Sequence, residues 1–430
     1  MNKPGNAMYK MAQMLWPINR SITGKGLRQS LNIISKYLPN LIIKKVPSGT
    51  KVFDWVVPEE WNVKEAYIIT PGGRKICDLK KNNLHLMSYS TPIKKVIELE
   101  ELEKHLYSLP DKPNAIPYVT SYYEKRWGFC IKHKDRKALK KGKYQVLIKS
   151  SFIKGHLNYG ELIIPGRLKK EVFLSTYICH PSMANNELSG PVVTTYIAKW
   201  IYSLRKKKYT YRIIFIPETI GSITYLSKNL NYLKKNVIAG YNVNCMGDDR
   251  SYSYLPSRYG DTLSDIVAQH VLKWTDKSFR SYTWKDRGSD ERQYCSPGVN
   301  LPIASIMRTK FREYSEYHTS LDKLGTVVKP NGLEGGFYAL QRAIEVIEKN
   351  ISPIIKTPCE PQLGKRGLFP TLSNASNKTL EKKTRLLMDF ISWCDGDNSL
   401  LDIAEKCNVP VWELYPLVED LKKFRLISYR

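Results

Sequence analysis

From Tyr144 onward the chain alternates short apolar runs with longer amphipathic segments, and this alternation is the strongest constraint on its fold. The apolar runs have the length of strands, and the segments between them place apolar residues at helical spacing. Such alternation predicts a sheet covered by helices on both faces. We expect the strands at 145–148, 162–164, 172–178, 212–217, 238–244 and 303–307, and the helices at 190–204, 220–233, 263–274 and 333–348.

The stretch 175–190, STYICHPSMANNELSG, is the most informative part of this pattern. A buried strand delivers Cys179 and His180 to the sheet edge, and a polar loop with Asn186 and Glu187 precedes the next helix. Open α/β sheets build their ligand sites at the carboxyl ends of strands. A capped turn with a hydrogen-bonded histidine would produce the same pattern, so both interpretations stay open at this point.

Later loops at strand ends also carry acids or a histidine. Several loops of this kind at one sheet edge are the pattern expected of a metal or acid/base site, although each loop alone is equally consistent with a cap or a surface turn. The segments are PE at 217–218, CMGDDR at 245–250, DRGSDE at 286–291 and YHTSLD at 317–322.

The first third of the chain has a different texture. Two helical segments occupy 1–40, and from 41 to 143 short β-like runs are broken by proline and glycine. We therefore expect an N-terminal helical part at 1–40, a small all-β domain at 41–143 and the α/β domain at 144–351. The aromatic residues of this region could form its core or line a cleft, and the core is expected for most of them. They are Trp55, Trp61, Tyr118, Tyr122, Tyr123 and Trp127.

The tail forms a separate region. A proline-rich linker is expected at 352–379, and 380–430 has the helix–turn–helix pattern of a winged helix. A DNA-reading helix needs basic residues, but the segment VWELYPLVEDLKKF is apolar and acidic through most of its length. We expect it to pack or to bind a protein, with nucleic-acid binding left open.

The net charge of +28 invites a nucleic-acid interpretation, because basic surfaces bind phosphates. The lysines are spread along the whole chain, however, so a solvated basic surface is the default expectation. The absence of an 18-residue apolar run and of a signal-peptide layout predicts a cytoplasmic protein without a membrane partner.

The eight cysteines contain no CxxC pair, which predicts reduced thiols, and Cys179 is expected to be a buried small residue rather than a nucleophile.

In their order along the chain, HP…NELSG, PETIGS, NCMGDD, RGSDERQYCSPGVNLP and YHTSLD resemble the motifs of the co-catalytic, two-zinc aminopeptidase fold. More closely, nearly the whole chain resembles the aminopeptidase-like proteins of bacterial polysaccharide-biosynthesis loci. The resemblance implies a phosphorylase/hydrolase-like mixed α/β sheet flanked by helices, with an inserted all-β domain and a C-terminal winged helix. It also implies a metal site at the carboxyl edge of the sheet.

The resemblance assigns roles to four residues of this sequence. His180 and His318 match metal-binding histidines, and Glu218 matches the glutamate that acts as general base. Asp290 matches the acid of the GSD motif, which would orient the substrate or the reacting group.

Three further positions depart from the family pattern. Asn186, Thr219 and Asn244 stand where the family has metal-binding carboxylates. Two divalent ions about 3.5–4 Å apart need carboxylates to offset their repulsion, and neutral side chains do not supply that charge. The departures therefore argue against a two-ion site.

A single zinc ion needs only three protein ligands and an open position for water. We predict that His180 and His318 supply two ligands and that Glu187 supplies the third, with Asp248 as the alternative. Glu187 is also well placed to complement the dipole of the following helix. Arg287 and Asp248 are expected to contact the substrate.

The predicted function is a metal-dependent hydrolase with one zinc ion, aminopeptidase-like or deacylase-like. It would act on an amide or peptide bond of a small molecule or short peptide, in glycan or modified amino-acid metabolism. The alternative is a non-catalytic binding or regulatory protein that retains the fold and uses the winged helix for interactions. The helical tail is also compatible with a homo-oligomer.

Overall fold

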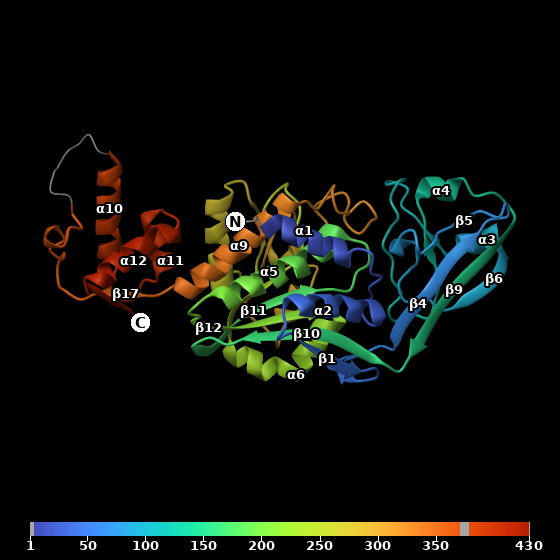
Figure 1. Ribbon diagram of the computed structural model, residues 1–430, viewed down its shortest axis with the longest axis horizontal. Coiled ribbons are helices and arrows are strands. Elements are labelled where there is room, and N and C mark those ends of the chain that lie inside the picture. Colours follow the sequence, from blue (N-terminus) through green and yellow to red (C-terminus); the bar gives the residue numbers. More distant parts are fainter. Residues whose placement is uncertain (1–3, 370–377, 430) are drawn as a thin grey trace. The chain divides into compact units, whose positions relative to one another are not determined.

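The computed structural model describes residues 4–369 and 378–429 (Figure 1). The chain forms two compact units, residues 1–268 with 278–340 and residues 269–277 with 341–430. The first unit is built on a mixed sheet in the order β1-β10-β12-β11-β13-β16-β14-β15. Its strands are β1 (Ile42–Pro47), β10 (His156–Ile164), β11 (Leu168–Tyr177), β12 (Tyr209–Ile216), β13 (Val237–Asn242), β14 (Ser253–Leu255), β15 (Arg280–Ser281) and β16 (Ile303–Met307).

The centre of this sheet is parallel. β11 lies between β12 and β13, and its Leu174 pairs with Ile213 on one side and Tyr241 on the other. Each of these side chains is completely buried. Since parallel strands bury both faces, the carboxyl ends of β11, β12 and β13 meet at one edge, where the polar loops follow.

Helices cover both faces, as the alternating pattern predicts. In Figure 1, α1 (Pro4–Leu15), α2 (Lys25–Tyr37) and α5 (Ser189–Ser203) lie on one side of the sheet, and α6 (Ile220–Asn236) lies on the other. The mixed α/β prediction is confirmed. The remaining helices of the α/β region are α7 (Leu263–Thr275), η3 (Trp284–Asp286), α8 (Glu291–Tyr294) and α9 (Pro330–Lys349).

The β-rich region forms its own four-stranded sheet in the order β5-β4-β9-β6. Its strands alternate buried and exposed residues, and β4 pairs with β9 over most of its length. β1 belongs to the main sheet, whereas β9 extends the β-rich sheet to residue 153. The elements are β2 (Lys51–Val52), β3 (Trp55–Val56), β4 (Glu60–Ile69), β5 (Lys75–Ile76), η1 (Asn83–His85), β6 (Ile93–Glu98), α3 (Leu99–Glu103), β7 (Leu106–Tyr107), β8 (Phe129–Cys130), α4 (His133–Lys137) and β9 (Lys143–Ile153).

The second unit contains the helix–turn–helix that the tail predicts. Ser399 is the N-cap of α11. Its side chain accepts the Asp402 N–H, and the Asp402 carboxylate accepts the Ser399 N–H. The two short strands at either end of this unit pair antiparallel. Its elements are β17 (Pro353–Ile355), η4 (Gly364–Arg366), α10 (Lys378–Ser392), α11 (Leu400–Cys407), η5 (Val411–Glu413), α12 (Leu414–Lys423) and β18 (Ile427–Tyr429).

The contact between α5 and the sheet edge depends on Gly190. A Cβ atom at this position would lie 2.4 Å from the Val243 carbonyl oxygen and 2.6 Å from Thr176 Oγ1. Neither neighbour is the end of a long flexible side chain, so only glycine lets the start of α5 approach β11 and β13 this closely.

We expect Gly190→Ala to lower the free energy of unfolding by about 1–3 kcal/mol, because overpacking must push α5 away from the sheet. Urea unfolding followed by circular dichroism measures the change. Gly72→Ala is the matched control, since a Cβ atom there has nothing within 4 Å. Equal stability of the two variants would contradict the close-packing argument.

Candidate functional site

The candidate site begins where β11 ends. Cys179 and His180 follow the strand directly, and the chain then enters the π-helical turn η2 (Ala184–Leu188), which leads into α5. All residues of this turn are buried. Single π-helical turns occur preferentially at functional sites, because they turn side chains away from the regular helical register.

Asp322 holds the η2 turn in place. Its Oδ1 accepts the N–H of Asn185 at 2.7 Å, and its Oδ2 accepts the N–H of Asn186 at 3.0 Å and the hydroxyl of Tyr314 at 3.0 Å. Burial raises the pKa of Asp322 to about 6, against the lowering effect of these donors. No role was predicted for Asp322. The only indication in the sequence is that Asp322 is an acidic residue in the loop that carries His318.

His180 is the centre of the site. Its Nδ1–H donates to Glu187 Oε2 at 2.7 Å, and its Nε2 lies 3.5 Å from Glu218 Oε2. Burial lowers the pKa of His180, but Cys179 and Glu187 together raise it well above its usual range. Burial raises the pKa of the Cys179 thiol to about 11, so this thiol is neutral near pH 7.

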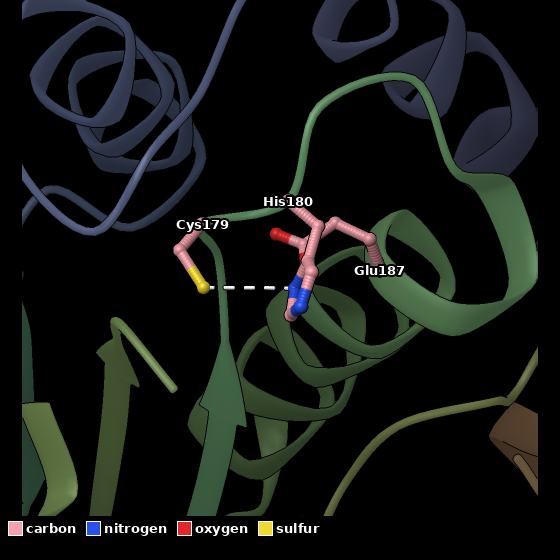
Figure 2. A group of neighbouring side chains, drawn as sticks. All are labelled: Cys179, His180 and Glu187. Atoms are coloured by element: carbon pink, nitrogen blue, oxygen red, sulfur yellow. Dashed lines mark hydrogen bonds and ion pairs between the residues drawn. The ribbon is translucent and has the colours of Figure 1, made fainter. Parts of the chain in front are cut away.

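Figure 2 shows Cys179, His180 and Glu187 converging from the end of β11 and the η2 turn. One donor atom from each side chain lies within 4.8 Å of the other two, and all three residues are buried. Thiolate, imidazole and carboxylate are the donors that zinc prefers in proteins. The cluster at the end of β11 therefore contains residue types that bind zinc, with His180 at its centre.

Buried Arg20 approaches this cluster from the segment between α1 and α2. Its Nε donates to the His180 carbonyl oxygen at 3.1 Å and lies 3.8 Å from Glu187 Oε1. Burial lowers the pKa of Arg20, and the charge of Glu187 opposes that shift. Arg20 could not be recognised from the sequence, because nothing in its local sequence indicates a contact 160 residues away.

Glu218 follows β12 and faces His180 from the other side. Its Oε1 accepts a hydrogen bond from Ser289 Oγ at 2.9 Å. Burial raises the pKa of Glu218, while the charges of His180 and Arg292 lower it. A carboxylate that is partly desolvated and held at one oxygen suits a general base.

Asp290 lies next to Glu218 and stabilises the turn that carries it. Its Oδ1 accepts the N–H of Thr219 and the hydroxyl of Ser222, both at 2.7 Å. Thr219 has φ 64°, a strained value for a β-branched residue. Burial and the charge of Glu218 raise the pKa of Asp290 to about 8.

His318 lies on the opposite side of the site and also has a strained backbone, with φ 53°. Its ring stacks on Tyr317 at 3.9 Å between centroids, and its centroid is 5.6 Å from that of His180. Burial, His180 and Arg312 lower the pKa of His318 to about 3, so its ring is neutral near pH 7. A neutral imidazole is the form that binds metal ions.

The β-rich region contributes a wall to the site through Tyr118. Its ring centroid lies 5.0 Å from that of His180 and 5.2 Å from that of His318. Its backbone N–H donates to the His318 carbonyl oxygen at 2.9 Å, beside a β-bridge between Pro117 and Thr319. The sequence left open whether Tyr118 belongs to a core or lines a cleft, and only the tertiary fold brings it to the histidines.

Asp248 and Arg287, which were predicted to contact the substrate, have other partners in the structure. The two carboxylate oxygens of Asp248 accept hydrogen bonds from the N–H and the hydroxyl of Thr309, at 2.8 and 2.5 Å. Arg287 is exposed, and its guanidinium lies 5.1 Å from the ring centroid of Trp284. Within the described residues, the contacts of these two side chains do not include His180 or Glu218.

The neutral residues at the family's metal positions are buried in the structure. Asn186 Nδ2 donates to the Tyr177 hydroxyl at 2.5 Å, and its Oδ1 has no hydrogen-bond partner among the described residues. Both polar atoms of the Asn244 side chain also lack a partner there. The Thr219 hydroxyl accepts from Arg292 at 2.8 Å. These side chains add no negative charge, so the geometry fits one ion better than two.

Comparison with known proteins agrees with this architecture. A Clostridium acetobutylicum protein, named for polysaccharide biosynthesis and an aminopeptidase-like domain, is 43% identical over 428 residues, covering 99% of this chain and 97% of its own length. A crystal structure from C. acetobutylicum, provisionally assigned as a peptidase, is 40% identical with a TM-score of 0.92, covering 99% and 97%. A zinc aminopeptidase from Bacillus subtilis has the same fold at 13% identity and a TM-score of 0.60, covering 80% of this chain and 95% of that one.

The fold and the site thus define an aminopeptidase-like α/β protein with an appended winged helix. The chain belongs to the family described as Domain of unknown function (DUF4910), which matches residues 9–350. Residues 350–429 match the winged helix-turn-helix family, which confirms the prediction for the tail. Among the described residues, no helix combines the length and the apolar character needed to cross a bilayer.

The raised pKa of Asp290 predicts how stability depends on pH. An aspartate in the unfolded chain has a pKa near 3.9, so between about pH 4 and 8 the folded protein binds a proton that the unfolded chain has lost. Linkage then makes the free energy of unfolding fall as pH rises, by up to about 1.4 kcal/mol per pH unit from this group.

We expect Asp290→Asn to reduce this slope, because the amide resembles the protonated acid and does not titrate. Urea unfolding of both proteins at pH 5, 6.5 and 8 measures it. Asp286→Asn is the control, since Asp286 is exposed and its pKa is lowered by the N–H and hydroxyl of Thr283. An unchanged slope in Asp290→Asn would assign the pH dependence to other groups.

Proposed function

We propose that the protein is a hydrolase of amide bonds that depends on a single zinc ion bound at His180 and His318. The observation that carries the proposal is the environment of His180, whose Nδ1–H is held by Glu187 while its Nε2 faces Glu218 and the ring of His318. Metal-binding histidines typically donate their second ring N–H to a carboxylate in this way.

The distances favour the Nε2 side of His180 for the ion. Two donors bound to one tetrahedral zinc ion at about 2.0–2.1 Å lie roughly 3.3 Å apart. The 2.7 Å between Nδ1 and Glu187 Oε2 is a hydrogen-bond distance, so we assign Glu187, predicted as a ligand, to orienting the ring. The third donor is then Asn186 Oδ1, a buried oxygen that no described residue satisfies.

When bound, the ion would polarise the substrate carbonyl and lower the pKa of a water molecule. Glu218 Oε2 takes the proton of that water and returns it to the leaving amine, while Ser289 holds Oε1 in position. Asp290 fixes the strained turn at Thr219 that aims Glu218. Tyr118 covers both histidine rings and limits the access of bulk water.

The substrate class rests on the comparisons. The C. acetobutylicum relative is named for polysaccharide biosynthesis, and the fold is that of zinc aminopeptidases. Both facts support an amide in a glycan precursor or in a short peptide as the bond that is cleaved. They also support the predicted aminopeptidase-like or deacylase-like reaction.

The position of the ion is tested by zinc content and by competition with a chelator. We expect about one zinc per chain, lost in His180→Ala and His318→Ala and retained in Cys179→Ser. Glu187→Gln is expected to weaken binding about 10- to 100-fold, and Asn186→Asp to strengthen it. If Cys179→Ser lost zinc while His318→Ala retained it, the ion would be assigned to the Nδ1 side of His180 instead.

The role of Glu218 is tested with amino-acid anilides and N-acetylated amino sugars as substrates. Glu218→Gln is expected to lower kcat about 10²- to 10⁴-fold with zinc content unchanged. Glu65→Gln is the control, since Glu65 is a partly buried glutamate that pairs with Lys149 on the β-rich sheet. A Glu218→Gln enzyme as active as the wild type would refute the general-base role, and a protein without zinc or activity would favour the non-catalytic binding alternative.

A further inference from the structure

A groove lies beside the β2–β3 hairpin, on the β-rich region. It encloses about 690 Å³, within the range of small-molecule sites. Its lining includes Asp54, Trp55, Pro58, Glu59 and, from a loop more than sixty residues later, Tyr123. The hairpin alone does not form the groove, because Tyr123 supplies one of its two aromatic rings.

The two aromatic rings form an open corner. Trp55 and Tyr123 meet edge to face with centroids 5.5 Å apart at 72°, and they are 37% and 55% exposed. Phe53 and Val56 on the same hairpin are about half exposed as well. Since soluble proteins rarely expose several large apolar side chains together, this cluster indicates a binding surface.

The charges of the groove narrow the choice of ligand. Asp54 and Glu59 are exposed carboxylates without an ion-pair partner among the described residues, and the lining contains no lysine or arginine. Asp54 and Glu59 therefore supply local negative charge in a chain whose net charge is +28. Aromatic faces combined with carboxylates complement an organic cation.

A row of tyrosines connects the groove to the candidate active site. Tyr118 touches both histidine rings, and its hydroxyl lies 2.6 Å from that of Tyr122. Tyr123, the next residue, lines the groove. One short loop therefore contributes a residue to each of the two sites.

We infer that the groove binds a protonated amino group of the substrate, at a position remote from the amide that reacts. The occupant would be an amine-bearing small molecule such as an amino sugar. That the occupant is the substrate rests on the proposed function. The binding of an ammonium group by the groove does not, so the two can fail separately.

The test compares glucosamine, which is cationic near pH 7, with N-acetylglucosamine, which has the same ring without the charge. Both are titrated into the full-length protein at low ionic strength while tryptophan fluorescence is recorded. We expect glucosamine to bind at least about 10-fold more tightly. Trp55→Phe should remove the fluorescence change, whereas Trp393→Phe, a control of matched exposure at 38%, should retain it.

Variants of the carboxylates and of the metal site separate the possible outcomes. Asp54→Asn and Glu59→Gln, combined in one variant, should abolish the preference for glucosamine. His180→Ala should leave this preference intact even if the zinc hypothesis fails. Equal affinity for both sugars would show recognition of the ring and overturn the proposal. The absence of saturable binding would also overturn the proposal. A dimer that is detected by sedimentation in the wild type and is lost in Trp55→Phe would overturn it as well.

Discussion

The carboxylate of Asp322 is the contact on which the geometry of the site depends. By accepting the N–H groups of Asn185 and Asn186, it satisfies backbone donors that would otherwise be buried without partners. The η2 turn is thereby held in its π-helical form, and Glu187 is presented to His180. A segment near the end of the α/β region thus determines the conformation of a loop more than 130 residues earlier.

This arrangement concentrates carboxyl groups in a buried place. Glu187, Glu218, Asp290 and Asp322 surround the site, and Arg20 is the fully buried cation beside them. Burial raises the pKa of the last three acids, because a desolvated carboxylate is costly. A site of this kind stabilises any cation that enters it, whether a proton on His180 or a metal ion.

The neutral residues at positions where the two-zinc pattern has carboxylates change the charge of the site. Asn186 and Asn244 keep the size of a carboxylate while removing its charge, and their unsatisfied buried atoms remain at the sheet edge. The single-ion site proposed above needs fewer carboxylates than a two-ion site, since each further divalent ion would need additional charge to offset repulsion. The backbone strain at Thr219 and His318 lies at the same edge, and strained residues of this kind cluster at functional sites.

Much of the fold was predictable because hydrophobic period and turn residues are local properties. The alternation after Tyr144 predicted a sheet covered by helices on both faces, and the family resemblance indicated His180, Glu218 and His318 as members of one site. The assignment of β1 to the main sheet was not predictable, because an edge strand in a β-rich context has no local signal for its partner. Arg20 and Tyr118 were missed for the same reason, since each reaches the site from a distant segment.

The sequence by itself determined the class of fold, the two histidines and the loss of charge at three metal positions, because these depend on residue type and order. Only the tertiary structure decided which atom of each side chain faces which neighbour. It turned Glu187 toward Nδ1 of His180, placed Asp248 against Thr309 and brought a loop of the β-rich region over both histidines. Such contacts join segments more than a hundred residues apart, and their geometry follows from how the whole sheet and its helices pack.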